Sequence, residues 1–193
     1  MLLEFDFNAW LVGLAVLGLV LIGLGWRSRF TLFRLFGAAL FGVYVLVVIS
    51  LTLFPMPLPD NNPIEPVLQQ IQQMQHVHAL NLLPLNFDSC WEFPRSCFTN
   101  LFGNILLTVP FGFGFGFLFR PRFREFFWWG FGPGLAIEGL QFVFNLVTGG
   151  AYRTVDINDV LLNALGAWVG FGLWWLWVEL VRYFVNSRLG LKE

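Results

Sequence analysis

Long apolar segments separated by short polar ones run along most of this chain. Five of them approach the ~20 apolar residues that an α-helix needs to cross the hydrocarbon core of a bilayer. They lie at residues 7–25, 32–54, 101–119, 126–148 and 157–184. The pattern predicts an all-α fold, a polytopic transmembrane helical bundle of about five helices. We expect a single membrane domain over residues 1–193, with a fifth helix long enough to tilt or to project beyond the bilayer.

The longest stretch between apolar segments is residues 55–99, which we expect to form one external loop. Within it, Val67, Leu68, Ile71 and Met74 recur with the period of a helix, while glutamines supply the other faces. This spacing is typical of an amphipathic helix. Such a helix could lie on the membrane surface, cover a polar site as a lid, or pack as a spacer on the external ends of the spans. Of these alternatives, the sequence favours the spacer.

Polar side chains recur at helical spacing within or next to these apolar segments. The three polar stripes are Asn100, Asn104 and Thr108 at the third segment, Glu138, Gln141 and Asn145 in the fourth, and Asp156, Asp159 and Asn163 at the fifth. A carboxylate at the centre of a bilayer costs about 2.5 kcal/mol or more on insertion scales. Acids kept there at that cost therefore mark a functional site.

These polar stripes are expected to meet in the external half of the bundle. With alternating spans, the third segment runs inward from its asparagines, the fourth runs outward past Glu138, and the fifth starts at the external surface. We therefore predict an outward-facing, partly buried pocket with Arg153 at its rim. The ligand-binding candidates are Asn100, Asn104, Glu138, Gln141, Arg153, Asp156, Asp159 and Asn163. Below Glu138 the spans are mostly Phe, Trp, Leu and Gly, so no path to the inner side is visible.

Glycines and one proline predict where helices pack or break. Gly112 and Gly116 form a small-xxx-small groove on the third segment, and Gly166 and Gly170 offer a similar groove on the fifth. Residues 130–134 should kink or break the fourth segment, because the proline among them cannot donate a backbone hydrogen bond.

Composition and charge agree with a membrane protein and give it an orientation. The chain is 57% hydrophobic and only 12% charged, which is too apolar for one soluble core. An isoelectric point near 6.1 argues against a nucleic-acid partner. Nine of the eleven basic residues share one side: Arg27, Arg29, Arg34, Arg120, Arg122, Arg124, Arg182, Arg188 and Lys192. Because cytoplasmic flanks are rich in Lys and Arg, we expect the N-terminus outside and the C-terminus in the cytoplasm.

Both cysteines, Cys90 and Cys97, lie in the loop 55–99. The exterior of a cell is oxidising, and a bridge between these two would leave no thiol over. We therefore predict a Cys90–Cys97 disulfide, with two free thiols as the alternative.

The motifs, taken in order, resemble the VanZ-like family of bacterial membrane proteins. The matching residues are Asn81-Leu-Leu-Pro84, Asn100-x-x-x-Asn104, Pro110-x-Gly112, Glu138-x-x-Gln141 and Arg153-x-x-Asp156-x-x-Asp159-x-x-x-Asn163-x-x-Gly166. They cover roughly residues 81–170 and leave out the first two spans. The resemblance implies a multi-pass protein of the bacterial plasma membrane and cell envelope. The family takes its name from a member associated with low-level resistance to the glycopeptide teicoplanin.

Three classes of function stay open. In the first, the pocket binds or modifies an amphiphilic envelope ligand, such as a lipid-linked precursor or a lipoglycopeptide, with a role in glycopeptide resistance. In the second, the protein is a small carrier or flippase. In the third, it is a structural or assembly subunit that associates with other membrane subunits, and its polar residues hold helices together. We favour the first, with membrane lipid as a partner.

The acidic residues leave the chemistry open as well. Glu138, Asp156 and Asp159 are candidates for catalytic acids, and the same three could hold a divalent cation through their oxygen atoms. No nucleophile stands at a recognisable spacing from a base. Whether the protein is an enzyme is therefore left undecided by the sequence.

Overall fold

The computed structural model describes residues 2–26, 31–57, 67–77, 79–86 and 94–189. Its long helices are α1 (Phe7–Trp26), α2 (Leu32–Leu53), α5 (Pro94–Phe119), α7 (Gly132–Thr148) and α8 (Ile157–Leu189). Two shorter helices, α3 (Val67–His76) and α6 (Phe123–Trp129), lie at the ends of the bundle. The strands are β1 (Leu2–Leu3), β2 (Met56–Pro57), β3 (Leu80–Asn81) and β4 (Val155–Asp156). The predicted all-helical membrane bundle is confirmed.

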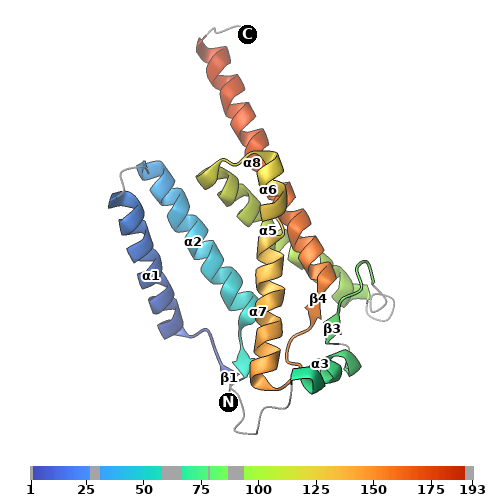
Figure 1. The fold of residues 1–193 in the computed structure, drawn as a ribbon. Coiled ribbons are helices and arrows are strands. Elements are labelled where there is room, and N and C mark those ends of the chain that lie inside the picture. Colours follow the sequence, from blue (N-terminus) through green and yellow to red (C-terminus); the bar gives the residue numbers. More distant parts are fainter. Residues whose placement is uncertain (1, 27–30, 58–66, 78, 87–93, 190–193) are drawn as a thin grey trace.

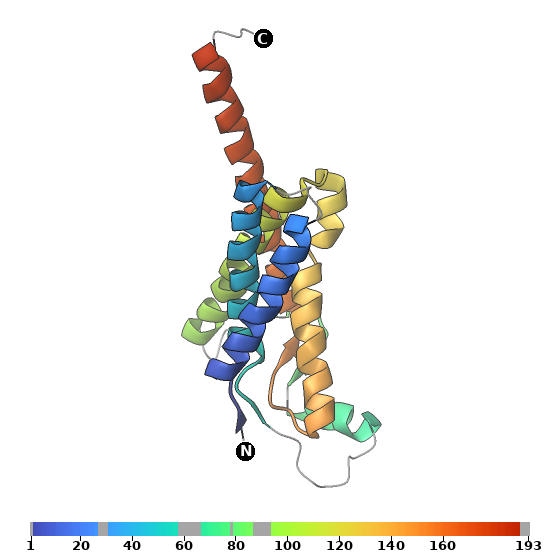
Figure 2. The same cartoon turned by 90° about the vertical axis from the view of Figure 1, so that its left-hand side faces the viewer.

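The long helices run up and down alternately (Figure 1). Within the described ranges, α1, α2, α5 and α8 are long and apolar enough to cross a membrane. The 33 residues of α8 span about 50 Å at ~1.5 Å per residue, well beyond the ~30 Å of a hydrocarbon core. Its C-terminal part extends past the other helices in both views (Figure 2), as predicted from its length.

The predicted fourth span is broken into α6 and α7. The break falls at Gly130 and Phe131, and Pro133 occupies the first turn of α7, where its missing N–H costs nothing. The 17 residues of α7 span only about 26 Å, somewhat less than a hydrocarbon core. Within the described residues neither α6 nor α7 is a candidate span by itself, so the fourth of the five predicted crossings stays a prediction.

Helices α5 and α8 form the centre of the bundle through interlocking glycines. A Cβ at Gly112 would overlap the carbonyl of Ala167, and a Cβ at Gly170 would overlap the carbonyl of Val109. Gly166 likewise faces the backbone at Ile105. Three of the four glycines in the two predicted grooves therefore meet the partner backbone, which approaches more closely than any side chain would allow, while Gly116 faces the ring of Trp174.

Two short strand pairs lie at the end of the bundle that carries the N-terminus (Figure 1). Strands β1 and β2 pair antiparallel, which joins the start of the chain to the segment after α2. Strands β3 and β4 pair parallel, with Asn81 opposite Asp156. This second pair holds part of the loop 55–99 beside the start of α8, so the loop and the polar motif of α8 form one unit.

The amphipathic helix of the loop is present as α3. It contacts β3 and α7, and its Met74 is almost fully buried. It lies at the end of α7 in both views (Figures 1 and 2). Of the alternatives left open by the sequence, this position supports a spacer packed on the ends of the spans. Cys90 lies outside the described residues, so its disulfide with Cys97 stays a prediction.

Candidate functional site

The first residues of α8 hold the external loop against the bundle. Asn81 donates its amide to the carboxylate of Asp156 at 3.1 Å, and the same oxygen accepts the backbone N–H of Asn158 at 2.8 Å. Asn158 accepts the N–H of Leu85 at 2.6 Å and donates to the carbonyl of Asn86 at 3.0 Å. Asp156 thus caps α8, and Asn158 fastens the loop to the helix.

Glu138 connects α7 to this motif. Its side chain is only 6% exposed, and its Oε2 accepts the backbone N–H of Asp156 at 2.8 Å. Glu138 also lies near the carboxyl groups of Asp156 and Asp159. The predicted meeting of the fourth and fifth segments is therefore present at this carboxylate.

Asp159 faces the third predicted segment. Asn100 on α5 donates its amide to both carboxylate oxygens of Asp159, at 3.1 and 3.5 Å. Asn104, one turn further along α5, lies beside the same carboxylate. Its buried amide nitrogen makes no well-formed hydrogen bond within the described residues. The asparagine stripe of α5 thus leads from an exposed residue inward to an acid of α8.

The stripe continues to Thr108 and Asn163, which are fully buried. The Thr108 hydroxyl donates to the backbone carbonyl of Asn163 at 2.6 Å, and the Asn163 amide donates to the carbonyl of Asp159 at 2.7 Å. The side-chain oxygen of Asn163 is buried and has no partner in the described part of the chain. An unsatisfied buried polar atom costs about 1–3 kcal/mol, so water or a ligand group at this position would be stabilising.

Gln141 and Arg153 face a different part of the bundle. Gln141 donates to the carbonyl of Thr52 at 3.0 Å, and Arg153 donates to the carbonyl of Phe54 at 2.9 Å. Carbonyls at the C-terminal end of a helix lack partners within the helix and favour a nearby cation. These two side chains therefore cap α2. The turn that carries Arg153 is itself held by Asn145, which donates to the Arg153 carbonyl at 2.7 Å.

A groove of about 690 Å³, which we call the outer groove, opens beside the asparagine stripe between α2 and α5. Its polar lining consists of Thr52, Arg95, Ser96, Thr99, Asn100 and Asn104. Asp159 lies behind Asn100, so the carboxylate is one side chain away from the open space. The groove can accept a polar group of substantial size and offers it hydroxyl, amide and guanidinium groups.

The arrangement of the acids bears on whether the site could hold a metal ion. Across the described ranges, no group of three or more His, Cys, Asp or Glu side chains is placed to hold a metal ion. One oxygen of Glu138 and one of Asp156 already accept backbone N–H groups. Among the residues described, the only salt bridge is Arg182 with Glu179, so no described basic side chain pairs with the three acids. The site resembles a hydrogen-bonding surface more than a cation cage.

Two contributions to the site were not foreseen from the sequence. Asn158 is 3% exposed and makes three of the hydrogen bonds at the start of α8. The signal available in the sequence was its position two residues after Asp156, because an aspartate is a typical helix cap and accepts the N–H two residues later. The carbonyl groups at the end of α2 are backbone atoms, and no side-chain pattern could indicate them.

A comparison of the sequence with models of protein families identifies the family of this chain. The VanZ/LLP1 family model matches residues 41–181, which is well over half of the chain. The match begins within α2, whereas the resemblance noted from the motifs left both early spans out. Neither the search of curated proteins nor the search of solved structures finds a significant match. On the strength of the family match, the chain belongs to the VanZ/LLP1 family of membrane proteins.

Proposed function

We propose that this VanZ/LLP1 protein binds the polar head of an amphiphilic envelope ligand in its outer groove. The ligand would be a lipid-linked precursor or a lipoglycopeptide that reaches the groove from the external leaflet of the plasma membrane. The single observation that carries the proposal is the asparagine stripe, which connects the groove to Asp159, an acid with no described basic partner.

The chemistry of the groove supports this class of ligand. Arg95 can meet a phosphate or carboxylate, while Asn100, Asn104 and Thr99 can meet hydroxyl and amide groups of a sugar or peptide head. The apolar outer faces of α2 and α5 can accommodate the hydrocarbon tail, since Leu51 and Leu106 are largely exposed there. A head with several hydrogen-bonding groups and one apolar tail fits both surfaces.

The structural alternative also has an observation in its favour. Gln141 and Arg153 cap the end of α2, which is what polar residues that hold helices together are expected to do. Capping accounts for two of the eight candidates. The hydrogen bond from Asn100 to Asp159 also joins α5 to α8, but Asn100 and Asn104 line the open groove as well, which a purely structural role does not require. We therefore assign helix capping to Gln141 and Arg153, and ligand binding to Asn100, Asn104 and Asp159.

The proposal is tested by replacing Asp159→Asn in protein reconstituted into nanodiscs. Teicoplanin and a polyprenyl pyrophosphate are the probes, and their dissociation constants are the measurement. Asparagine keeps the volume but removes the charge, and a hydrogen bond to a charged group contributes about 1.5–3 kcal/mol. We therefore expect about tenfold or greater weakening for whichever probe binds.

The matched control is Asp6→Asn, which removes another acid predicted to lie outside. Asp6 caps α1 by accepting the Ala9 N–H, and asparagine is an equally good capping residue. This variant should bind like the wild type. Equal affinities of the Asp159→Asn variant and the wild type would contradict the proposal and favour the structural role.

A further inference from the structure

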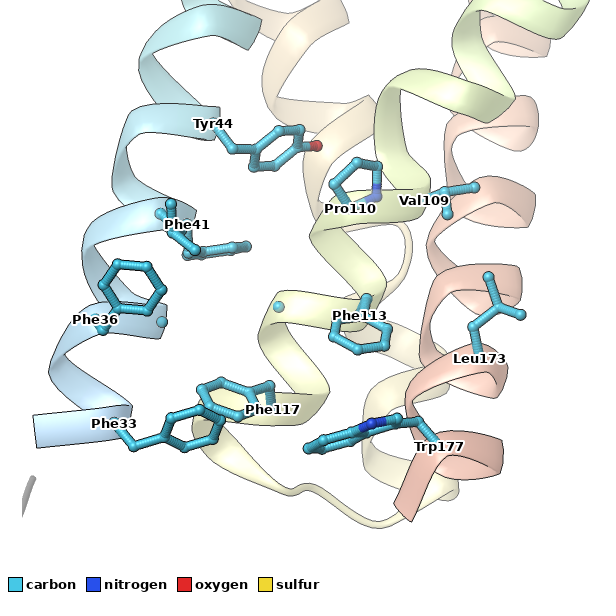
Figure 3. A pocket seen from close by; sticks show the side chains of 13 residues that line it. Phe33, Phe36, Phe41, Tyr44, Val109, Pro110, Phe113, Phe117, Leu173 and Trp177 are labelled. Atoms are coloured by element: carbon cyan, nitrogen blue, oxygen red, sulfur yellow. The ribbon is translucent and has the colours of Figure 1, made fainter. Parts of the chain in front are cut away.

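A second cavity, whose lining is drawn in Figure 3, lies along the first half of α2, whereas the outer groove lies at the last turn of that helix. This aromatic cavity has a volume of about 520 Å³ and lies between α2, α5 and α8. Its walls include Phe33, Phe41, Phe113, Phe117 and Trp177. The volume falls within the roughly 300–1,000 Å³ of small-molecule sites. The side chains that form it offer almost only apolar surface, so its occupant must be apolar as well.

The length of the aromatic cavity matches one leaflet of a bilayer. It extends along α2 from Phe33 to Tyr44, which is about 16 Å at ~1.5 Å per residue. This is about half of the ~30 Å hydrocarbon core. The far end is fixed by Tyr44, whose hydroxyl donates to the Leu107 carbonyl at 2.6 Å. A chain that enters beside Phe33 would therefore end near the middle of the membrane.

A smaller cavity with basic residues continues from the entrance. It has a volume of about 310 Å³, and it shares Phe33, Phe117 and Trp177 with the aromatic cavity. Arg34 and Arg120 line it, and neither takes part in a salt bridge in the described structure. A hydrocarbon-sized cavity thus opens directly into a space that carries two unneutralised positive charges.

The backbone at Arg120 gives independent support. Arg120 has a φ of 51°, in the left-handed region that glycine adopts easily and that other residues rarely adopt. Its N–H closes the end of α5 by donating to the Gly116 carbonyl at 3.0 Å. Glycine would meet this backbone requirement without strain. An arginine at such a position indicates that its side chain has a use there.

We propose that an anionic phospholipid binds here, with its phosphate at Arg34 and Arg120 and one acyl chain in the aromatic cavity. The basic residues predict that this end faces the cytoplasm, so the lipid would come from the inner leaflet. The cavity lies among helices that are apolar enough to span a membrane, where lipid hydrocarbon chains surround the protein. A chain gains little by leaving the bilayer for an equally apolar cavity, so the two arginines supply the selectivity. This site is separate from the outer groove and does not depend on the function proposed for it.

The test uses the full chain in nanodiscs that contain equal amounts of phosphatidylglycerol and phosphatidylcholine. The protein is released from the nanodiscs, and native mass spectrometry counts the lipid molecules that it retains. We expect one retained phosphatidylglycerol per protein. The double variant Arg34→Gln/Arg120→Gln should lower its occupancy ratio over phosphatidylcholine about 30-fold, since each basic residue near an anionic lipid contributes about fivefold. The Arg124→Gln variant is the control, because Arg124 is exposed at the same end and lines neither cavity.

A second pair of variants tests the acyl chain. Leu173→Trp fills the aromatic cavity, whereas Leu165→Trp adds the same bulk to an equally exposed position of α8 outside it. Only Leu173→Trp should lower lipid retention, and a Leu165→Trp variant that retains lipid shows that the added bulk alone does not unfold the protein. Equal retention of both lipids by the wild type would overturn the proposal. Undiminished retention in the glutamine variant or in Leu173→Trp, or a second protein copy in place of the lipid, would overturn it too.

Discussion

At the scale of single residues, the polar side chains of the outer half serve three different purposes. Asp156 and Asn158 fasten the loop to α8, Gln141 and Arg153 cap α2, and the asparagine stripe faces the outer groove. Their spacing in the sequence is similar. Helical spacing grouped Glu138 with Gln141, yet Glu138 meets the start of α8 and Gln141 meets the end of α2, so the spacing did not predict which partner each one meets.

Asn158 provides a direct test of the loop attachment. The change Asn158→Ala removes hydrogen bonds to Leu85 and Asn86 and leaves their backbone groups without these partners. We expect a loss of roughly 2 kcal/mol in the free energy of unfolding, measured by thermal denaturation in detergent. Asn186→Ala, near the other end of α8, should cost little. Equal losses in the two variants would show that the attachment does not depend on Asn158.

At the scale of the elements, the contact between α5 and α8 depends on which glycines face the partner helix. Gly170 faces the Val109 carbonyl, whereas a Cβ at Gly172, two residues later, would point into open space. The pair offers a matched experiment on one helix.

Gly170→Ala should destabilise the protein by about 1–3 kcal/mol, because overpacking forces the two backbones apart. Gly172→Ala should be neutral or stabilising by up to about 1 kcal/mol, because alanine is the better helix former. Thermal denaturation of both variants under the same conditions is the measurement. A similar effect of both changes would mean that the glycines act through helix propensity alone.

The elements also show how far sequence reasoning reaches. The apolar segments, the break near Pro133 and the two small-residue grooves follow from local rules, because each depends on residues a few positions apart. The pairing of β3 with β4 and the capping of α2 do not follow from such rules. They join residues about 75 to 99 positions apart, and at least one partner in each contact is a backbone atom, for which the sequence offers no pattern.

At the scale of the whole molecule, the membrane bundle and the VanZ/LLP1 family are established, while the orientation stays a prediction. It can be tested by cysteine labelling in a background in which Cys90 and Cys97 are replaced by serine. A membrane-impermeant reagent should reach a Thr99→Cys variant from outside intact cells and should reach an Arg122→Cys variant only after lysis. Labelling of Arg122→Cys in intact cells would reverse the assignment of the two sides.

The glycine contact also determines how this bundle can move. The backbones of α5 and α8 approach each other closely at three glycines, so we expect these two helices to move together. By contrast, α1 buries no residue and α2 buries only Ala38. The outer groove therefore has one fixed wall, on α5, and one wall, on α2, that can be displaced. We expect the width of the groove to depend on three hydrogen bonds: those from Gln141 and Arg153 to the end of α2, and that from Tyr44 of α2 to the Leu107 carbonyl of α5.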